Sequence, residues 1–213
     1  MFTGCIEEIG IVKEIDQRRL AVSAEMISRD ISIGDSIAIN GACLTVTELR
    51  GMIFICDISP ETIKTTCMDD IKSGDRVNME RALLATGRLN GHLVSGHIDG
   101  IGVVKRRELK GDVIILTIDI PAEQIRYCIK KGSIAIDGVS LTINNVAGRE
   151  ISLSIIPHTA KMTTIGRKGS GKRVNIETDQ LAKYVENMLI NRDSMKKNNR
   201  IDVELLERYG FVN

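Results

Sequence analysis

The sequence has almost no net charge, since 29 lysines and arginines stand against 28 aspartates and glutamates. A protein that binds nucleic acid through the phosphates usually has a basic excess or a basic stripe, so no nucleic-acid partner is expected. No apolar run approaches the roughly 18 residues that a membrane-spanning helix needs, so no membrane span is expected either. The first residues lack a basic stretch followed by a long apolar one, which argues against a signal peptide.

The sequence also lacks any Cys-x-x-Cys pair. Its cysteines are odd in number: Cys5, Cys43, Cys56, Cys67 and Cys128. They are therefore expected to be free thiols of a cytoplasmic protein. The three histidines show no ligand spacing with any pair of cysteines, so no metal site is expected.

What the sequence does contain is an internal repeat. Residues 36–46 read Ser-Ile-Ala-Ile-Asn-Gly-Ala-Cys-Leu-Thr-Val, and residues 133–143 read Ser-Ile-Ala-Ile-Asp-Gly-Val-Ser-Leu-Thr-Ile. The same offset of 97 residues relates Gly74–Glu80 to Gly171–Glu177, and an offset of 92 relates Phe2–Gly10 to Val94–Gly102. Repeats of this kind decide the architecture. They predict two tandem units, residues 1–90 and 91–178, followed by a tail over 179–213.

Each copy of the repeated stretch predicts a β-hairpin, because Asn-Gly and Asp-Gly tolerate the positive φ angles of a tight turn. Side chains alternate between the two faces of a strand. Cys43 and Thr45 therefore share one face after the first turn, as do Ser140 and Thr142 after the second. One such row could be the wet face of a half-exposed hairpin. Two copies that keep the same small polar pair favour a binding surface.

Short apolar runs between turn residues fill the rest of each unit, a pattern typical of sandwiches and small barrels. We therefore expect two similar antiparallel barrels. Short helical turns are expected over Ala24–Ser28, with Ser23 as the N-cap, and over Pro121–Tyr127.

The tail breaks the strand pattern. After Asp179, apolar residues recur at helical spacing: Leu181, Val185, Met188 and Leu189. A polar loop is expected over Asp193–Arg200, and a second short helix over Val203–Tyr209. The stripe of the first helix could pack on the chain's own barrel or against another subunit, and the sequence leaves both open.

Taken together and in order, these blocks resemble riboflavin synthase over nearly the whole chain, to about Asp193. The resemblance rests on Met1-Phe-Thr-Gly, Asn40-Gly-Ala-Cys-Leu-Thr, Gly91-His-Leu-Val-Ser-Gly-His-Ile, Asp137-Gly-Val-Ser-Leu-Thr and two Arg-Val-Asn-x-Glu strands. It implies an all-β fold of two tandem Greek-key barrels followed by a C-terminal α-helix. Each barrel would bind one molecule of 6,7-dimethyl-8-ribityllumazine.

The resemblance also implies a reaction, in which one lumazine gives a four-carbon unit to another without metal or cofactor. The products would be riboflavin and a ribitylaminopyrimidinedione. The protein would be a homotrimer held by its C-terminal helices, with the active site between the N-terminal barrel of one subunit and the C-terminal barrel of the next. Association with lumazine synthase is left open.

The catalytic candidates that match the family are His97, Ser140, Asp137 and Cys43. A neutral, flat heterocycle needs hydrogen bonds from small groups and backbone amides, and few groups here can move a proton near neutral pH. His97 could instead be a hydrogen-bonded core histidine, and Cys43 a small buried apolar residue. Asp137, beside the turn, could orient a catalytic partner.

The substrate contacts implied by the resemblance lie in both repeats. In the first they are Phe2, Gly4, Cys5, Ile6, Cys43, Leu44, Thr45, Asp57, Ile58, Ser59, Pro60, Glu61 and Thr62. In the second they are Gly96, His97, Ile98, Lys131, Ser140, Leu141, Thr142, Ser154, Ile155, Ile156, Pro157, His158 and Thr159. His158 departs from the family pattern, because it stands where the first repeat has Glu61 and an acidic residue is common.

Two other functions compete with the enzyme. A fluorescent antenna protein that binds lumazine or flavin without catalysis uses the same repeats but loses polar residues in one half, whereas both halves keep theirs here. A flavin-dependent reductase would bring a glycine-rich nicotinamide-binding unit, and the sequence has none.

Overall fold

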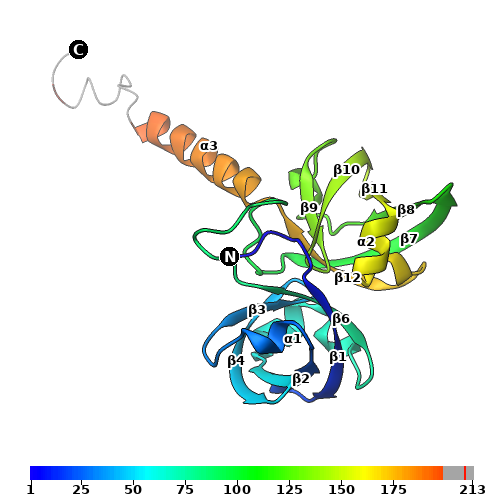
Figure 1. Ribbon diagram of the computed structural model, residues 1–213. Coiled ribbons are helices and arrows are strands. Elements are labelled where there is room, and N and C mark those ends of the chain that lie inside the picture. Colours follow the sequence, from blue (N-terminus) through cyan, green and yellow to red (C-terminus); the bar gives the residue numbers. More distant parts are fainter. Residues whose placement is uncertain (199–208, 210–213) are drawn as a thin grey trace. The chain divides into compact units, whose positions relative to one another are not determined.

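The computed structural model describes residues 1–198 and Tyr209, with side chains of the C-terminal helix described as far as Ile190. Two closed antiparallel barrels of six strands each dominate the structure (Figure 1). The first barrel consists of β1 (Glu8–Ile15), β2 (Arg19–Ser23), β3 (Ser36–Ile39), β4 (Ala42–Arg50), β5 (Ile53–Asp57) and β6 (Arg76–Arg81). The second consists of β7 (Gly100–Lys110), β8 (Val113–Asp119), β9 (Ser133–Ile136), β10 (Val139–Ala147), β11 (Glu150–Ile155) and β12 (Arg173–Thr178).

The two barrels have the same strand order, β1-β2-β5-β4-β3-β6 in the first and the corresponding β7-β8-β11-β10-β9-β12 in the second. Strands β3, β4 and β5 are hairpin-connected neighbours, and β6 returns to lie beside β3, which is a Greek key. The predicted all-β fold of two tandem Greek-key barrels with a C-terminal helix is therefore confirmed. The predicted division of the chain at residues 90 and 178 stays a prediction.

Each barrel has its own apolar core. In β4 the alternation after the turn buries Leu44 and Val46 in the first core, while Thr45 is exposed. In β10 the corresponding Ile143 is fully buried in the second core. The small polar residues that alternate with these apolar ones lie on the outside of each barrel, as predicted: Cys43 and Thr45 in β4, and Ser140 and Thr142 in β10.

The helices differ in part from the sequence predictions. Two short helices, α1 (Pro60–Thr65) and α2 (Pro157–Met162), were missed, although Ser59 followed by proline is a helix-start signal and the Ser59 hydroxyl does accept the Thr62 N–H. The tail helix, α3 (Gln180–Asn198), begins after Asp179 as predicted. The predicted loop from Asp193 is wrong, because α3 continues to Asn198. The predicted second helix over Val203–Tyr209 lies, except for Tyr209, outside the described residues.

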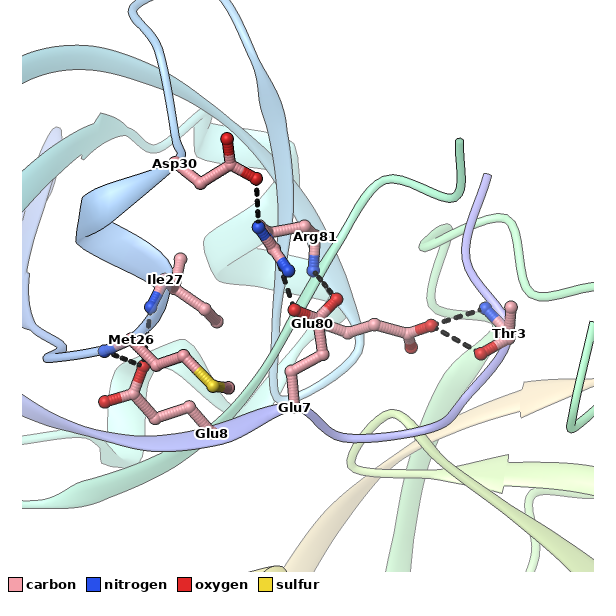
Figure 2. Close-up of polar contacts among 8 residues, drawn as sticks. All are labelled: Thr3, Glu7, Glu8, Met26, Ile27, Asp30, Glu80 and Arg81. Atoms are coloured by element: carbon pink, nitrogen blue, oxygen red, sulfur yellow. Dashed lines mark hydrogen bonds and ion pairs between the residues drawn. The ribbon is translucent and has the colours of Figure 1, made fainter. Parts of the chain in front are cut away.

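The predicted N-cap at Ser23 is also wrong. Ser23 is the last residue of β2, and the turn that follows ends in a 3-10 helix over Ile27–Arg29. The carboxylate of Glu8 instead accepts hydrogen bonds from the backbone N–H groups of Glu25, Met26 and Ile27 at 2.6 to 3.0 Å. Figure 2 shows the bonds from Met26 and Ile27. The second predicted turn contains a 3-10 helix over Ile125–Tyr127.

The contact between the barrels repeats the internal symmetry of the sequence. Asn78 donates from Nδ2 to the Asp137 carbonyl at 2.9 Å, and Asn175 donates in the same way to the Asn40 carbonyl at 2.8 Å. These asparagines belong to the two Arg-Val-Asn-x-Glu strands, β6 and β12. Between them the two turn glycines, Gly41 and Gly138, meet so closely that a Cβ on either would lie 2.7 Å from the backbone nitrogen of the other. The repeated motifs therefore dock the two barrels on each other.

Of the helices that the structure describes, none has the length and apolarity needed to cross a membrane.

Candidate active site

Each of the two polar strand faces predicted from the repeat is contacted by a backbone segment of the other repeat. Cys43 of β4 donates its N–H to the carbonyl of Gly96 at 2.8 Å, and Ser140 of β10 donates to the carbonyl of Gly4, also at 2.8 Å. The segment before β7 thus crosses to the first barrel, and the segment before β1 crosses to the second. A backbone bridge between Phe2 and Val94 joins the two crossing segments.

Glycine is required where the segments cross. Gly4 and Gly96 have φ angles of 77° and 84°, which L-residues with side chains rarely adopt. A Cβ on Gly4 would lie 2.6 Å from the Ser140 Cβ, and one on Gly96 would lie 2.5 Å from the Cys43 Cβ. Because of these glycines, the crossing backbone comes into direct contact with the polar strands.

The residues that follow these glycines anchor the crossing in the opposite cores. Ile98 packs against the core of the first barrel, and Ile6 packs against the core of the second. The first candidate ligand surface therefore combines Cys43–Thr45 with Gly96–Ile98. The second combines Ser140–Thr142 with Gly4–Ile6. The sequence had suggested one pocket within each repeat, and the structure shows that each surface takes residues from both.

A buried glutamate holds each crossing segment. Glu80 accepts the N–H and the hydroxyl of Thr3, both at 2.7 Å (Figure 2). It also accepts the N–H of Gly4 at 2.9 Å. Glu177 accepts the corresponding three bonds from Ser95 and Gly96. Burial raises the pKa of both carboxyl groups, and the hydrogen bonds that they accept oppose this shift.

The arginines near these strands pair with other carboxylates. Arg173 pairs with Asp69 and Asp70, both at 3.0 Å. The arginine that approaches the first crossing segment is Arg81. It forms ion pairs with Glu7 at 2.7 Å and Asp30 at 2.5 Å (Figure 2).

The hydroxyl of Ser140 is paired with a histidine that the sequence had not singled out. His92 Nδ1 lies 2.7 Å from Ser140 Oγ, and His92 is only 8% exposed. Burial lowers the pKa of His92, so the imidazole is neutral near pH 7. In the described part of the chain, Nε2 of His92 has no hydrogen-bond partner.

This geometry favours one tautomer. A buried N–H without an acceptor is rarer and less favourable than an unused lone pair, so the proton is assigned to Nδ1. Nδ1–H then donates to Ser140 Oγ, and the Ser140 proton is free to point at a ligand. The sequence signal was present, because His92 lies in the quoted Gly-His-Leu-Val-Ser-Gly-His-Ile block.

The structure separates the four catalytic candidates. Cys43 is half-buried on the first surface, where the segment that carries the exposed His97 also lies. Ser140 is half-buried on the second surface, with Cys5 on the segment beside it. Cys5 and His97 occupy matched positions of the repeat. The first surface therefore combines the Cys43 thiol with the exposed imidazole of His97, and the second combines the Cys5 thiol with the Ser140–His92 pair.

Asp137 belongs to neither surface. It is 1% exposed, its Oδ1 accepts the N–H of Asn175 at 2.8 Å, and its Oδ2 forms an ion pair with Lys168 Nζ at 2.8 Å. Both carboxylate oxygens are thus engaged at the contact between the barrels. The hydroxyl of Ser140 is partnered by His92, so a catalytic role for Asp137 stays a prediction without a contact that supports it.

The ring of Phe2 is fully buried and packs with Ala38, Val94, Ala135 and the half-buried Cys43. It fills the space between the two crossing segments. The predicted role of Phe2 as a cover over a ligand stays a prediction.

The other predicted contacts lie on or just after the strands that neighbour these surfaces. Asp57 pairs with Thr45 across β4 and β5, and α1 follows with the remaining predicted contacts of this repeat. In the second barrel Ser154 accepts a hydrogen bond from Asn144, and α2 follows with the exposed His158. Substrate contact by these residues remains a prediction.

Lys131 has a strained backbone. Its φ angle is 69°, whereas the matched position of the first repeat is Gly34, at 95°. A left-handed conformation costs an L-residue roughly 1–2 kcal/mol, and such strain tends to be kept where function requires the side chain.

Lys131→Gly is therefore expected to raise the free energy of unfolding by about 1 kcal/mol and to weaken ligand binding at the second surface. Urea unfolding and fluorescence titration with riboflavin measure the two effects. Gly34→Lys, the reverse change at the matched position of the first repeat, is the control and should lower the free energy of unfolding by a similar amount. Unchanged binding by Lys131→Gly would remove Lys131 from the site.

Both repeats match a known protein family. The model of the lumazine binding domain matches the chain twice, over residues 3–82 and 95–179. The chain is 42% identical to riboflavin synthase of Photobacterium phosphoreum over 217 residues, which covers all of both proteins. It is 39% identical to riboflavin synthase of Bacillus subtilis (strain 168), over 99% of this chain and all of that protein.

Solved structures of LumP are also similar. LumP complexed with riboflavin superposes with a TM-score of 0.78 at 28% identity, over 84% of this chain and 99% of that one. LumP complexed with 6,7-dimethyl-8-(1'-D-ribityl) lumazine gives a TM-score of 0.76 at 26% identity, with the same coverage. Two matched lumazine binding domains and full-length relatives near 40% identity show that the chain belongs to the riboflavin synthase family.

Proposed function

We propose that this protein is a riboflavin synthase that converts two molecules of 6,7-dimethyl-8-ribityllumazine into riboflavin and 5-amino-6-(ribitylamino)pyrimidinedione. The observation that carries the proposal is the pair of composite surfaces, each built from a polar strand and a crossing segment of the other repeat. Two related but unequal surfaces suit a reaction in which two copies of one substrate play different roles.

The unequal equipment of the surfaces suggests a division of roles. Removal of a proton from the C7 methyl group leaves negative charge on the lumazine. A preorganised donor such as the Ser140 hydroxyl, itself receiving a bond from His92, stabilises such charge. At the first surface Cys43 offers a thiol, which can act as a nucleophile, and His97 offers an exposed imidazole, which can move a proton.

Both surfaces lie on the outside of a barrel, with Thr45 and Thr142 exposed. A ligand on either surface would keep one face open, and a second ligand could stack there. We propose that a second subunit supplies it, in a homotrimer that joins the N-terminal barrel of one subunit to the C-terminal barrel of another. Apolar side chains of α3 that are more than half exposed suit such self-association: Leu181, Tyr184, Val185, Met188, Leu189 and Ile190.

Truncation after Thr178 is expected to convert the trimer into monomers and to abolish riboflavin formation, because α3 is removed while both barrels stay intact. Light scattering measures the mass, and riboflavin titration checks that the barrels still bind ligand. A trimer that survives truncation would show that contacts between barrels suffice.

Incubation of the protein with the dimethyl-ribityllumazine tests the activity, and riboflavin fluorescence or chromatography reports the product. The alternative is a lumazine- or flavin-binding protein without catalysis, an idea supported by the likeness to ligand-bound LumP. Lumazine that stays bound and unchanged would favour that alternative. The free thiols of Cys5 and Cys43, and of the three buried cysteines, agree with the proposed cytoplasmic setting.

A further inference from the structure

A cavity of about 720 Å³ lies between the two barrels and is lined by residues of both. None of its lining residues belongs to either candidate ligand surface. Its walls are the segments that lead into β6 and β12, so they are related by the 97-residue repeat. Because the repeat supplies both walls, matched positions can be compared directly.

The two walls have diverged in charge. The first repeat has Asp70 and Asp75 where the second has Arg167 and Lys172, and it has Ile71 where the second has Lys168. The first barrel closes with the acidic or apolar residue at each of these positions, so the fold does not require the basic ones. Six cations and three carboxylates line the cavity, which gives it a positive excess.

Several of these charges are already neutralised. Arg173 is paired with Asp69 and Asp70, and Lys168 is held by the buried Asp137. Within the residues that the structure describes, Lys72, Arg76, Arg167 and Lys172 take part in no ion pair, and neither does Asp75. The uncompensated charge is therefore positive, and it lies at the mouth of the cavity because all of these residues are exposed.

Thr164 is one of the residues that line this cavity, and its hydroxyl is buried. Thr164 is 8% exposed, and its backbone N–H donates to Asn78 Oδ1 at 2.7 Å, but its Oγ1 has no hydrogen-bond partner in the described part of the chain. The matched residue of the first repeat is Cys67, whose pKa burial raises to about 12, so the thiol is neutral. A buried hydroxyl normally finds a partner. For the Thr164 hydroxyl, a ligand in the cavity could provide this hydrogen-bond partner.

We propose that this cavity binds a phosphate dianion, either free or carried as the monoester of a small molecule. Phosphate oxygens accept hydrogen bonds from hydroxyls and charge-assisted bonds from arginine and lysine. Thr164 Oγ1 supplies the neutral donor, and Arg167, Lys172 and Lys168 supply the charge. The volume exceeds what phosphate alone would fill, so the cavity has room for the organic part of a monoester.

Calorimetric titration of the full-length protein tests the proposal, with inorganic phosphate in one arm and ribose 5-phosphate in the other. Chloride keeps the ionic strength constant, and unphosphorylated ribose is the ligand control. One saturable site per chain is expected. Tighter binding of ribose 5-phosphate would identify a monoester site, and tighter binding of inorganic phosphate would identify a site for the free ion; either result supports the proposal.

Two variants locate the site. Lys172→Asp restores the residue type of the first repeat and should weaken binding at least tenfold, and Thr164→Val removes only the hydroxyl and should weaken it severalfold. Lys110→Asp makes the same charge change on the β7–β8 hairpin, far along the sequence, and should leave the dissociation constant within twofold. Riboflavin titration confirms that each variant is folded. No saturable binding at 10-mM ligand (about the weakest useful level), or equal loss in Lys110→Asp, would overturn the proposal.

Discussion

Replacement of Ser140 by alanine is expected to lower kcat by about 100- to 1,000-fold, the loss seen when a preorganised donor to a developing negative charge is removed. The structural reason is the 2.7 Å contact to His92, which fixes the hydroxyl on the second surface. The neutral state of His92, which follows from its lowered pKa, lets it orient the hydroxyl without adding charge. Steady-state rates of riboflavin formation give kcat and KM separately.

Cys43→Ser is the matched control for this prediction. It converts the first repeat to the residue of the second, keeps a small polar side chain, and should change kcat less than tenfold. His92→Asn should fall between the two variants, because Ser140 stays in place but loses its orienting partner. If Cys43→Ser proved more damaging than Ser140→Ala, the main catalytic group would lie on the first surface.

Much of the fold could be predicted from the sequence, because the information is local. The Asn-Gly and Asp-Gly turns fix two hairpins, and alternation along β4 and β10 decides which residues enter each core. The repeat then makes the second barrel a copy of the first. The helices α1 and α2 were missed because each occupies only six residues, too few to show a helical period.

The residues of the candidate site could be predicted from the sequence, but which segments meet to form it could not. Gly4 and Ser140 lie 136 positions apart, and no pattern in either segment says that they meet. From the sequence, each barrel was expected to bind one lumazine by itself. In the structure the first surface takes Gly96–Ile98 from the second repeat, so a fragment that ended near Arg88 would lack part of this surface.

The same reason explains why the contact between His92 and Ser140 could not be predicted from the sequence. Asp137 lies three residues before Ser140, which suggests that the two side chains interact. In the structure, however, the Asp137 carboxylate accepts a hydrogen bond from Asn175, whereas the Ser140 hydroxyl contacts His92. His92 stands 48 residues away and supplies the contact, because the segment before β7 passes the second surface on its way to the first. Gly91 permits this passage, since a Cβ there would lie 2.0 Å from the Thr3 carbonyl oxygen.

The second large effect is expected at the glutamates that hold the crossing segments. Glu177→Ala leaves the N–H groups of Ser95 and Gly96 and the Ser95 hydroxyl without their acceptor. The loss should lower the free energy of unfolding by on the order of 3 kcal/mol. It should also reduce riboflavin formation, because Gly96 would no longer be held against Cys43. Glu80→Ala should have the same effects through Thr3 and Gly4, and urea unfolding with activity assays measures both.

The pH dependence separates the charge of Glu177 from its packing. Burial raises its folded-state pKa above the ordinary value of 4.5, so between these two values the folded chain binds more protons than the unfolded one. The free energy of unfolding therefore falls as pH rises through this window, and the full cost of the buried charge is present above the raised pKa. Glu177→Gln cannot titrate and lacks this contribution.

The difference in unfolding free energy, wild type minus Glu177→Gln, should accordingly decrease as pH rises from about 4.5 to neutrality. Glu108→Gln, at an exposed position of β7, is the control for the removal of one carboxylate. A difference that grew with pH would mean that the bonds from Ser95 and Gly96 outweigh burial, so that the ionised carboxylate, rather than the protonated one, is the form that the folded protein prefers.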